Sequence, residues 1–177
     1  MEKKEKSMMP HAMKVGAFIG LGLIIFSVLL YAFGINSNEF QFLGYLIMAI
    51  GIFMGIKPYR DKVMEGYISY GNSLKIGVLI ALFSSFIFNF YTYFFYKYID
   101  PSQLDALTEQ LKIQMANQGK TEEEMDLALR IMEKFLTPGW LFISGLFGYT
   151  FVGFLFSLII SIFLKKENTF TDIEPNQ

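Results

Sequence analysis

The sequence predicts an all-α membrane protein with four transmembrane helices, and three observations lead to this fold class. Of the 177 residues, 53% are hydrophobic and only 18% are charged, against about 25% charged in a typical soluble domain. The charges are segregated, so that long intervals of the chain contain none. Four of these intervals are long enough, at about 1.5 Å of helix rise per residue, to cross a hydrocarbon layer of about 30 Å.

Each predicted span is an apolar run bounded by a turn or by charges. The first run holds twelve Val, Ile, Leu or Phe residues, together worth about −5 kcal/mol on an insertion scale. A cleaved signal peptide is the alternative for this run, but its apolar core would be only about 7–15 residues long, so we expect a retained helix. The predicted spans are residues 15–34, 40–56, 76–96 and 139–164.

Basic residues gather in three segments that four spans would place on one side of the membrane. Residues 1–14 hold four Lys, the loop 57–75 holds four Lys or Arg, and the tail 165–177 holds two, which makes ten of the 15. The short loop 35–39 has none. Because basic loops stay on the cytoplasmic side, we predict that the loop 57–75 and both termini are cytoplasmic. Pro58 is expected to end the second helix, since proline lacks the backbone donor.

The segment 97–138 is predicted to form an extracytoplasmic amphipathic helical hairpin. Asp100 is expected to cap its first helix, with Pro101 at the first helical position, and Gly119 is placed to end that helix. Thr121 has a glutamate three positions on, the spacing of a capping box that starts a second helix. Apolar stripes at helical spacing could pack on each other, on the membrane interface or on a partner: Leu104, Leu107, Leu111 and Met115, then Met125, Leu129, Met132 and Leu136.

The spans contain little that could support catalysis. No Asp, Glu, Lys, Arg or His lies inside any of them, and intramembrane ionisable residues are what mark proton relays and coupled-ion sites. The chain has no Cys, which excludes thiolate nucleophiles and disulfides, and the lone His11 lacks the companions that a metal site needs. Asp61 and Glu65, four residues apart, are better explained by salt bridges than by a catalytic pair. We therefore expect no enzymatic activity, cofactor or metal.

The candidate site residues are polar or small. Asn89 is the most polar residue deep in a span, with Ser84, Ser85 and Thr92 nearby. Two readings stay open for this group: interhelical hydrogen bonds, worth about 0.6–2 kcal/mol each in membranes, or a polar path. Small residues at packing intervals indicate contacts between helices of the bundle or a homodimer face: Gly16 and Gly20, Gly51 and Gly55, Gly77 and Ala81, Ser157 and Ser161. Anionic lipid headgroups are expected to contact the basic loop at Lys57, Arg60 and Lys62.

Several stretches of the chain resemble one protein family. They are KPYRD followed by GYISYG, IDPS, QGKTEEEMDLAL, MEKFLTPG and the closing GFLFSLIISIFLKK. From about Lys14 to Lys166 the chain resembles the bacterial membrane proteins catalogued as domain of unknown function 4199, found mainly in Bacteroidota, with a mild departure at residues 70–74. The resemblance implies a multi-pass protein of the inner membrane and supplies no activity, ligand or catalytic residue.

Two function hypotheses follow. The leading one is a non-enzymatic envelope or accessory protein that acts through helix–helix or hairpin contacts, with membrane lipids and a homo-oligomer or larger membrane complex as its partners. The alternative is a small oligomeric transport or lipid-handling protein whose pathway would use the Asn89 region. Nucleic acid is not an expected partner, because a net charge of −1 gives no basic field.

The predicted topology can be tested by labelling from the two sides of the membrane. Labels placed at Lys62 and at Lys120 should react from opposite sides, because the basic loop is predicted inside and the hairpin outside. Membrane-impermeant reagents applied to sealed cells and to inverted vesicles measure this. Labelling of both positions from the same side would contradict the four-span arrangement.

Overall fold

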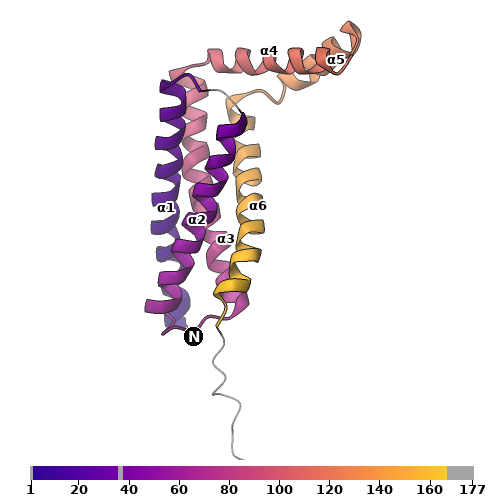
Figure 1. The fold of residues 1–177 in the computed structure, drawn as a ribbon. Coiled ribbons are helices and arrows are strands. Elements are labelled where there is room, and N and C mark those ends of the chain that lie inside the picture. The colour runs from indigo at the N-terminus through magenta and orange to yellow at the C-terminus, as the bar shows by residue number, and fades with distance from the viewer. Residues whose placement is uncertain (1, 36–37, 167–177) are drawn as a thin grey trace, which may run out of the picture. The chain divides into compact units, whose positions relative to one another are not determined.

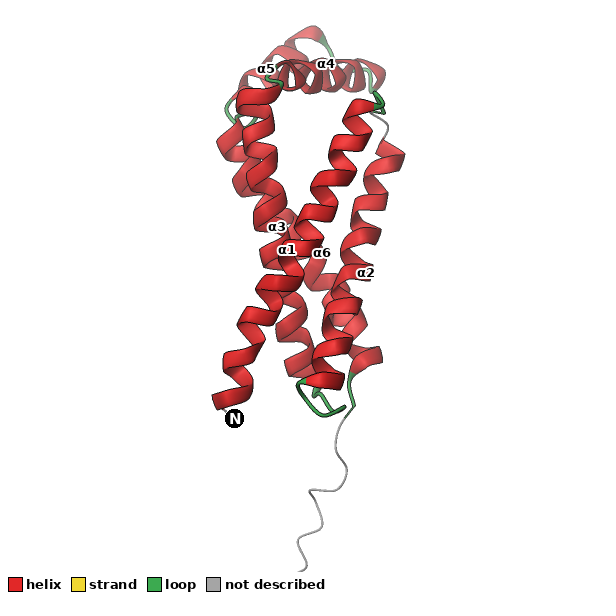
Figure 2. Ribbon diagram, turned by 90° about the vertical axis from the view of Figure 1, so that its left-hand side faces the viewer, coloured by secondary structure: helices red, strands yellow, loops and turns green. Residues whose placement is uncertain are grey.

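The computed structural model describes residues 2–35 and 38–166, with side chains for 8–35 and 42–166. Every regular element within these residues is a helix (Figures 1 and 2), apart from one isolated antiparallel bridge between Ile68 and Lys166. Four helices are long and apolar enough to cross a membrane, which confirms the predicted fold class. The elements are α1 (Glu2–Ala32), α2 (Asn38–Lys62), α3 (Tyr70–Phe94), the π-helical η1 (Phe95–Ile99), α4 (Ser102–Asn117), α5 (Glu122–Glu133) and α6 (Pro138–Leu164).

The chain divides into two compact units, which we call the first and the second unit. The first unit runs to Phe88 and resumes at Gly148, so it contains α1, α2, most of α3 and most of α6. The second unit is Asn89–Phe147, which contains the end of α3, η1, α4, α5 and the start of α6.

In the first unit, glycines let α1 approach the backbone of α3. A Cβ atom added to Gly16 would lie 3.0 Å from the carbonyl oxygen of Ile80, and one added to Gly20 would lie 3.1 Å from that of Ser84. Larger side chains at either glycine would separate the two helices. Close backbone contact of this kind stabilises helix pairs in membranes, where lipid is as apolar as the helices and burial alone supplies no driving force.

A second close contact joins α3 to α6. A Cβ at Gly77 would lie 2.6 Å from the hydroxyl oxygen of Ser157, and a Cβ at Gly153 would collide with the side chain of Ala81. The two helices are antiparallel, and this register places Ser73 at the level of Ser161. We call these six buried residues the α3–α6 seam: Ser73, Gly77 and Ala81 of α3, and Gly153, Ser157 and Ser161 of α6.

The outer surface of the first unit is apolar, while small polar side chains lie inside it. Ser84, Ser85 and Ser157 are fully buried. Large apolar side chains are exposed along one row of α1 and one row of α6, the distribution expected of helices that face lipid rather than water. These rows are Phe18, Leu21, Ile25 and Leu29 in α1, and Phe151, Leu155, Ile159 and Phe163 in α6.

Pro58 lies inside α2, which continues to Lys62, so the prediction that this proline ends the helix is wrong. A proline inside a helix costs about 3 kcal/mol, because it removes one hydrogen bond and crowds the preceding turn. The extra turn is nevertheless kept because of its tertiary contacts. It buries Tyr59 completely and brings the guanidinium of Arg60 to the end of α6.

The start of α3 also differs from the predicted span. The helix begins at Tyr70, where Ser73 and Ile76 are fully buried, so its first turns pack in the bundle. Most of the segment 57–75 is therefore helical. Only residues 63–69 connect α2 to α3.

The local signals in the second unit act mostly as the sequence indicates. Gly119 follows the end of α4 with φ of +75°, and Thr121 and Glu124 form the predicted capping box, with N···O distances of 3.0 and 3.3 Å. Asp100 differs from its predicted role as the N-cap. Since α4 begins at Ser102, the Asp100 carboxylate instead accepts hydrogen bonds from side chains, including the amide of Gln103 at 3.0 Å.

Gly153→Ala should destabilise the first unit, whereas Gly148→Ala on the same helix should not. The methyl group at Gly153 would collide with Ala81, and overpacking of this kind costs about 1–3 kcal/mol. A Cβ at Gly148 has nothing within 4 Å, so the control change should be neutral or stabilising by up to about 1 kcal/mol through helix propensity. Unfolding of both variants in mixed micelles of rising SDS fraction measures the difference. Equal stability of the two would contradict the seam.

Candidate functional site

Asn89, the first candidate, is buried in the second unit with 3% of its surface exposed. Its side-chain amide lies against the backbone of α6 at Gly145, where an added Cβ would be 2.9 Å from the Asn89 Cγ atom. Thr92 lies one turn further along α3 in the same unit, and Ser85 is fully buried in the first unit. The contact at Gly145 favours a packing role for Asn89.

Two buried hydroxyl groups of the first unit bond to their own helices. The Ser84 hydroxyl donates to the Ala81 carbonyl at 3.0 Å, and the Ser157 hydroxyl donates to the Gly153 carbonyl at 2.7 Å. Such bonds satisfy a buried hydroxyl without a partner on another helix. In the part of the chain that the structure describes, the buried hydroxyls of Ser73, Thr150 and Ser161 have no hydrogen-bond partner.

The four candidate glycines all contact a neighbouring helix of the same chain. Besides the contacts of Gly16 and Gly20 with α3, a Cβ at Gly51 would lie 2.6 Å from the side chain of Ile19. A Cβ at Gly55 would lie 2.7 Å from that of Val15. Packing within the bundle therefore accounts for the spacing of these residues.

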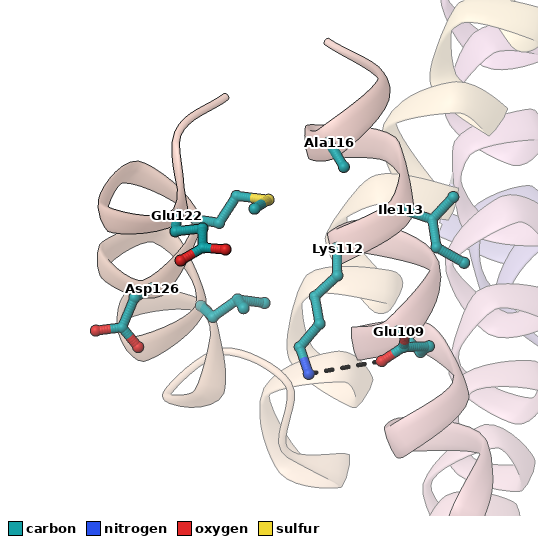
Figure 3. A pocket seen from close by; sticks show the side chains of 8 residues that line it. Glu109, Lys112, Ile113, Ala116, Glu122 and Asp126 are labelled. Carbon is teal, nitrogen blue, oxygen red and sulfur yellow. Dashed lines mark ion pairs between the residues drawn. The ribbon is translucent and has the colours of Figure 1, made fainter. Parts of the chain in front are cut away.

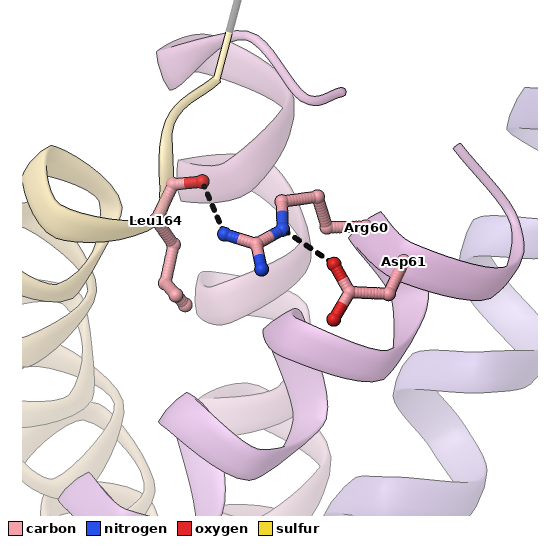
Figure 4. A network of polar contacts seen from close by, with 3 residues as sticks. All are labelled: Arg60, Asp61 and Leu164. Carbon is pink, nitrogen blue, oxygen red and sulfur yellow. Dashed lines mark hydrogen bonds and ion pairs between the residues drawn. The ribbon is translucent and has the colours of Figure 1, made fainter. Parts of the chain in front are cut away.

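Arg60 connects the end of α2 to the end of α6 through a hydrogen bond (Figure 4). Its Nε donates to the Asp61 carboxylate at 2.7 Å, and its Nη1 donates to the Leu164 carbonyl oxygen at 3.3 Å. A cation at a helix C-terminus satisfies an orphan carbonyl and complements the helix dipole. The Arg60 side chain is only 18% exposed, while Lys57 and Lys62 are exposed. Of the three basic residues expected to contact lipid, these two lysines are the more accessible.

The isolated bridge between Ile68 and Lys166 lies near Arg60, at the end of the first unit where α2 and α6 end. Ile68 and Lys166 exchange two backbone hydrogen bonds of 2.9 Å, and the Ile68 side chain is buried. The Lys166 ammonium lies 5.4 Å from the centre of the Tyr67 ring, within cation–π range. Lys166, two residues beyond α6, is thus held against the connection between α2 and α3.

His11 has a structural contact that sequence reasoning missed. Its Nε2 lies 2.9 Å from the Gly55 carbonyl oxygen, and its ring centre is 5.2 Å from that of Tyr59. The residue therefore links α1 to the last turns of α2. A lone histidine before a span carries no sequence signal for such a contact, because the partner is a backbone carbonyl 44 residues away.

The two carboxylates considered as a pair do not share a helix. Asp61 is in the last turn of α2 and bonds to Arg60. Glu65 lies beyond Lys62 in a left-handed conformation with φ of +57°. Among the residues that the structure describes, no group of three or more His, Cys, Asp or Glu side chains could hold a metal ion.

The second unit contains an open hollow of about 400 Å³ between α4 and α5 (Figure 3). We call it the α4–α5 hollow. Its lining combines apolar residues of both helices, which we call the floor, with charged residues, which we call the rim and in which Lys112 pairs with Glu109 at 3.5 Å. The lining residues are Ile113, Ala116, Met125 and Leu129, which are apolar, and Glu109, Lys112, Glu122 and Asp126, which are charged.

The comparisons with known proteins identify one family. A family profile matches residues 14–166, and its description is "Protein of unknown function (DUF4199)". No curated protein matches the chain, and no solved structure matches it either.

Asn89→Leu should lower the stability of the protein by about 0.6–2 kcal/mol, the range for a lost interhelical polar contact. Gly145→Ala should also destabilise it, because the added methyl group would meet the Asn89 amide. The double variant Asn89→Ala/Gly145→Ala should lose less than the sum of its single changes, since contacting residues couple. SDS titration measures all of these, with Gly148→Ala as the control. Full stability of Asn89→Leu would contradict the packing role, and normal assembly with lost flux would favour the polar path.

Proposed function

The chain belongs to the family described as Protein of unknown function (DUF4199), and we propose that it is a non-enzymatic accessory protein of a membrane complex. In this proposal the four long helices anchor the protein in the bilayer. The α4–α5 hollow binds a segment of another envelope protein. The fold class and family are compatible with this role and assign no activity of their own.

The composition of the α4–α5 hollow is the observation that carries the proposal. Protein-binding surfaces typically combine an apolar centre with a polar rim. Here Met125 and Leu129 of α5 line the hollow together with Ala116 of α4, and four charged residues share the lining. The hollow is open rather than enclosed, which suits a peptide segment better than a small molecule.

The charges of the rim favour a cationic partner segment. Glu109, Glu122 and Asp126 are acidic, Lys112 is the one basic residue of the lining, and Lys112 already pairs with Glu109. Electrostatic complementarity sets partner choice and encounter rate more than affinity. The partner segment in this proposal therefore has an apolar side chain for the floor and Lys or Arg residues for the rim.

We also propose the orientation of the chain. Both termini and the connection between α2 and α3 would lie on the cytoplasmic side of the bacterial inner membrane, with α4 and α5 outside. Support comes from three contacts that gather the basic segments at one end of the first unit. They are His11 to Gly55, Arg60 to Leu164, and Ile68 to Lys166.

A transport or lipid-handling role is less well supported. A pathway through the chain would have to use the buried polar side chains of the spans. Asn89 packs on Gly145, and the seam residue Ser157 bonds within its own helix. A pathway would therefore need these contacts to open, whereas the α4–α5 hollow is accessible as it stands.

Photo-crosslinking from the hollow tests the proposed function. A photoreactive amino acid at Ala116, which lines the hollow, should capture one partner in stoichiometric yield in native membranes. The same amino acid at the exposed Gln110 of α4 should not. Native mass spectrometry in mild detergent would then identify the complex.

Charge reversal supplies the matched control. Asp126→Lys on the rim should abolish the cross-link, because it repels a cationic segment. Glu133→Lys, at the other end of α5 and outside the lining, should retain it. A partner captured equally from both positions, or with either charge reversal, would contradict binding at the hollow.

A further inference from the structure

The apolar surface of α5 is wider than its contact with α4 requires. One row of α5 residues, Met125, Leu129 and Met132, is half-buried, and its first two members line the α4–α5 hollow. A second apolar row lies beside it and is open. We call this second row the α5 outer row: Leu127, Ile131 and Phe135, which are 63%, 52% and 45% exposed.

The spacing of the α5 outer row makes it one continuous strip. Its members follow each other at intervals of four residues, so they lie above one another on one side of the helix axis. Phe135 lies just beyond α5, in the turn that ends the helix. An exposed strip of large apolar side chains is typical of a surface that something else covers.

Continuity with α6 indicates what covers the α5 outer row. The Phe135 ring contacts the Trp140 ring, with 5.1 Å between their centres. Trp140 is in the first turn of α6, a helix apolar enough to span a membrane, and it is itself 44% exposed. Tryptophan is enriched where such helices leave the hydrocarbon for the headgroup region. The outer row thus continues into the exposed apolar side chains at the start of α6.

The connection from α5 to α6 keeps α5 close to this boundary. Only residues 134–137 separate Glu133 from Pro138, so even a fully extended chain would span at most about 18 Å. A backbone turn shortens it further, since the Phe135 and Leu136 amides both donate to the Met132 carbonyl at 2.8 Å. The end of α5 cannot lie far from the start of α6.

Most charged residues of α5 lie away from the outer row. Glu124 is the exception, about 20° around the axis from Ile131, and its carboxylate accepts from the Thr121 amide in the capping box. At about 100° per residue, Glu122 lies about 180° around the axis from Ile131, and Asp126 lies about 140° from it. Both acidic residues are exposed. An apolar side opposite a charged side is the pattern of a helix that lies in the plane of a membrane surface.

We propose that α5 lies along the bilayer surface, with the α5 outer row inserted among the lipid headgroups and the first acyl carbons. Trp140 continues this contact at the start of α6. The helix has five acidic residues and only one Arg, so attraction to anionic lipid does not hold it there. Burial of apolar surface does, and the contact therefore forms on zwitterionic lipid and persists in high salt. This inference does not depend on the proposed function.

A fluorescent probe on α5 tests the inference in the full-length protein. The chain has no Cys, so single cysteines can be placed without a background. Ile131→Cys belongs to the outer row, and Asp126→Cys on the charged side is the matched control. Each is labelled with the environment-sensitive dye NBD and reconstituted as one copy per phosphatidylcholine nanodisc.

The expected result is a contrast between the two positions. NBD at position 131 should emit at shorter wavelength than at 126. Lipids spin-labelled near the carbonyl region should quench NBD at position 131 several-fold more strongly than NBD at position 126. Aqueous iodide should quench it several-fold less than at position 126. The contrast should survive 1 M salt. At that concentration the Debye length is about 3 Å, so charge–charge attraction is screened while burial of apolar surface is not. Trp140, the single tryptophan, reports whether each variant is inserted, because brominated lipid should quench it in both.

Two results would overturn the inference. Equal iodide quenching at 131 and 126 would mean that the outer row faces water. Protection of 131 from iodide without quenching by spin-labelled lipid would mean that protein covers it, and one copy per nanodisc excludes a second chain as the cover. Neither result overturns the hollow, because both concern Ile131, which is not among the residues that line it. The two proposals can therefore fail separately.

Discussion

The close approach of α3 to α1 and to α6 is the constraint on which the rest of the first unit depends. Gly16 and Gly20 bring α1 onto the α3 backbone, and Gly77 with Gly153 does the same between α3 and α6. In lipid, helices gain little from hiding apolar surface from each other, so contact distance and shape decide which pairs form. Large apolar side chains are consequently turned outward, and serines and glycines occupy the inside.

That constraint also explains how buried polar groups are accommodated. Helices held this close leave little room for water, so a hydroxyl must bond to its own backbone or stay unpaired. Ser84 and Ser157 take the first course within their helices. Asn89, with a longer side chain, requires a glycine opposite it on α6, and Gly145 provides the space. The position of Asn89 thus depends on the small size of the residue that it faces.

Long apolar runs without charges were sufficient to predict the fold class. The end of α4 at Gly119 and the capping box of Thr121 could also be predicted, since each depends on residues within one turn. The contacts at the end of the first unit could not be predicted. Pro58 stays inside α2 because Tyr59 and Arg60 beyond it have partners on other elements. Likewise, the apolar stripe that includes Met125 predicts an apolar side of α5, but the sequence does not say which part of that side α4 covers. The exposure of Ile131 in the structure distinguishes the open outer row from the half-buried row of Met125.

The two apolar rows of α5 have linked consequences. A helix rotates as a rigid body, so seating Ile131 in the headgroup region turns the side that lies about 180° away, at Glu122, toward water. Glu122 and Asp126 belong to the rim of the α4–α5 hollow. The charged part of the rim would then face the aqueous phase, and a partner would approach it from solution rather than through lipid. Because the short connection to Pro138 limits rotation of α5, the membrane contact would fix the direction in which the hollow is presented.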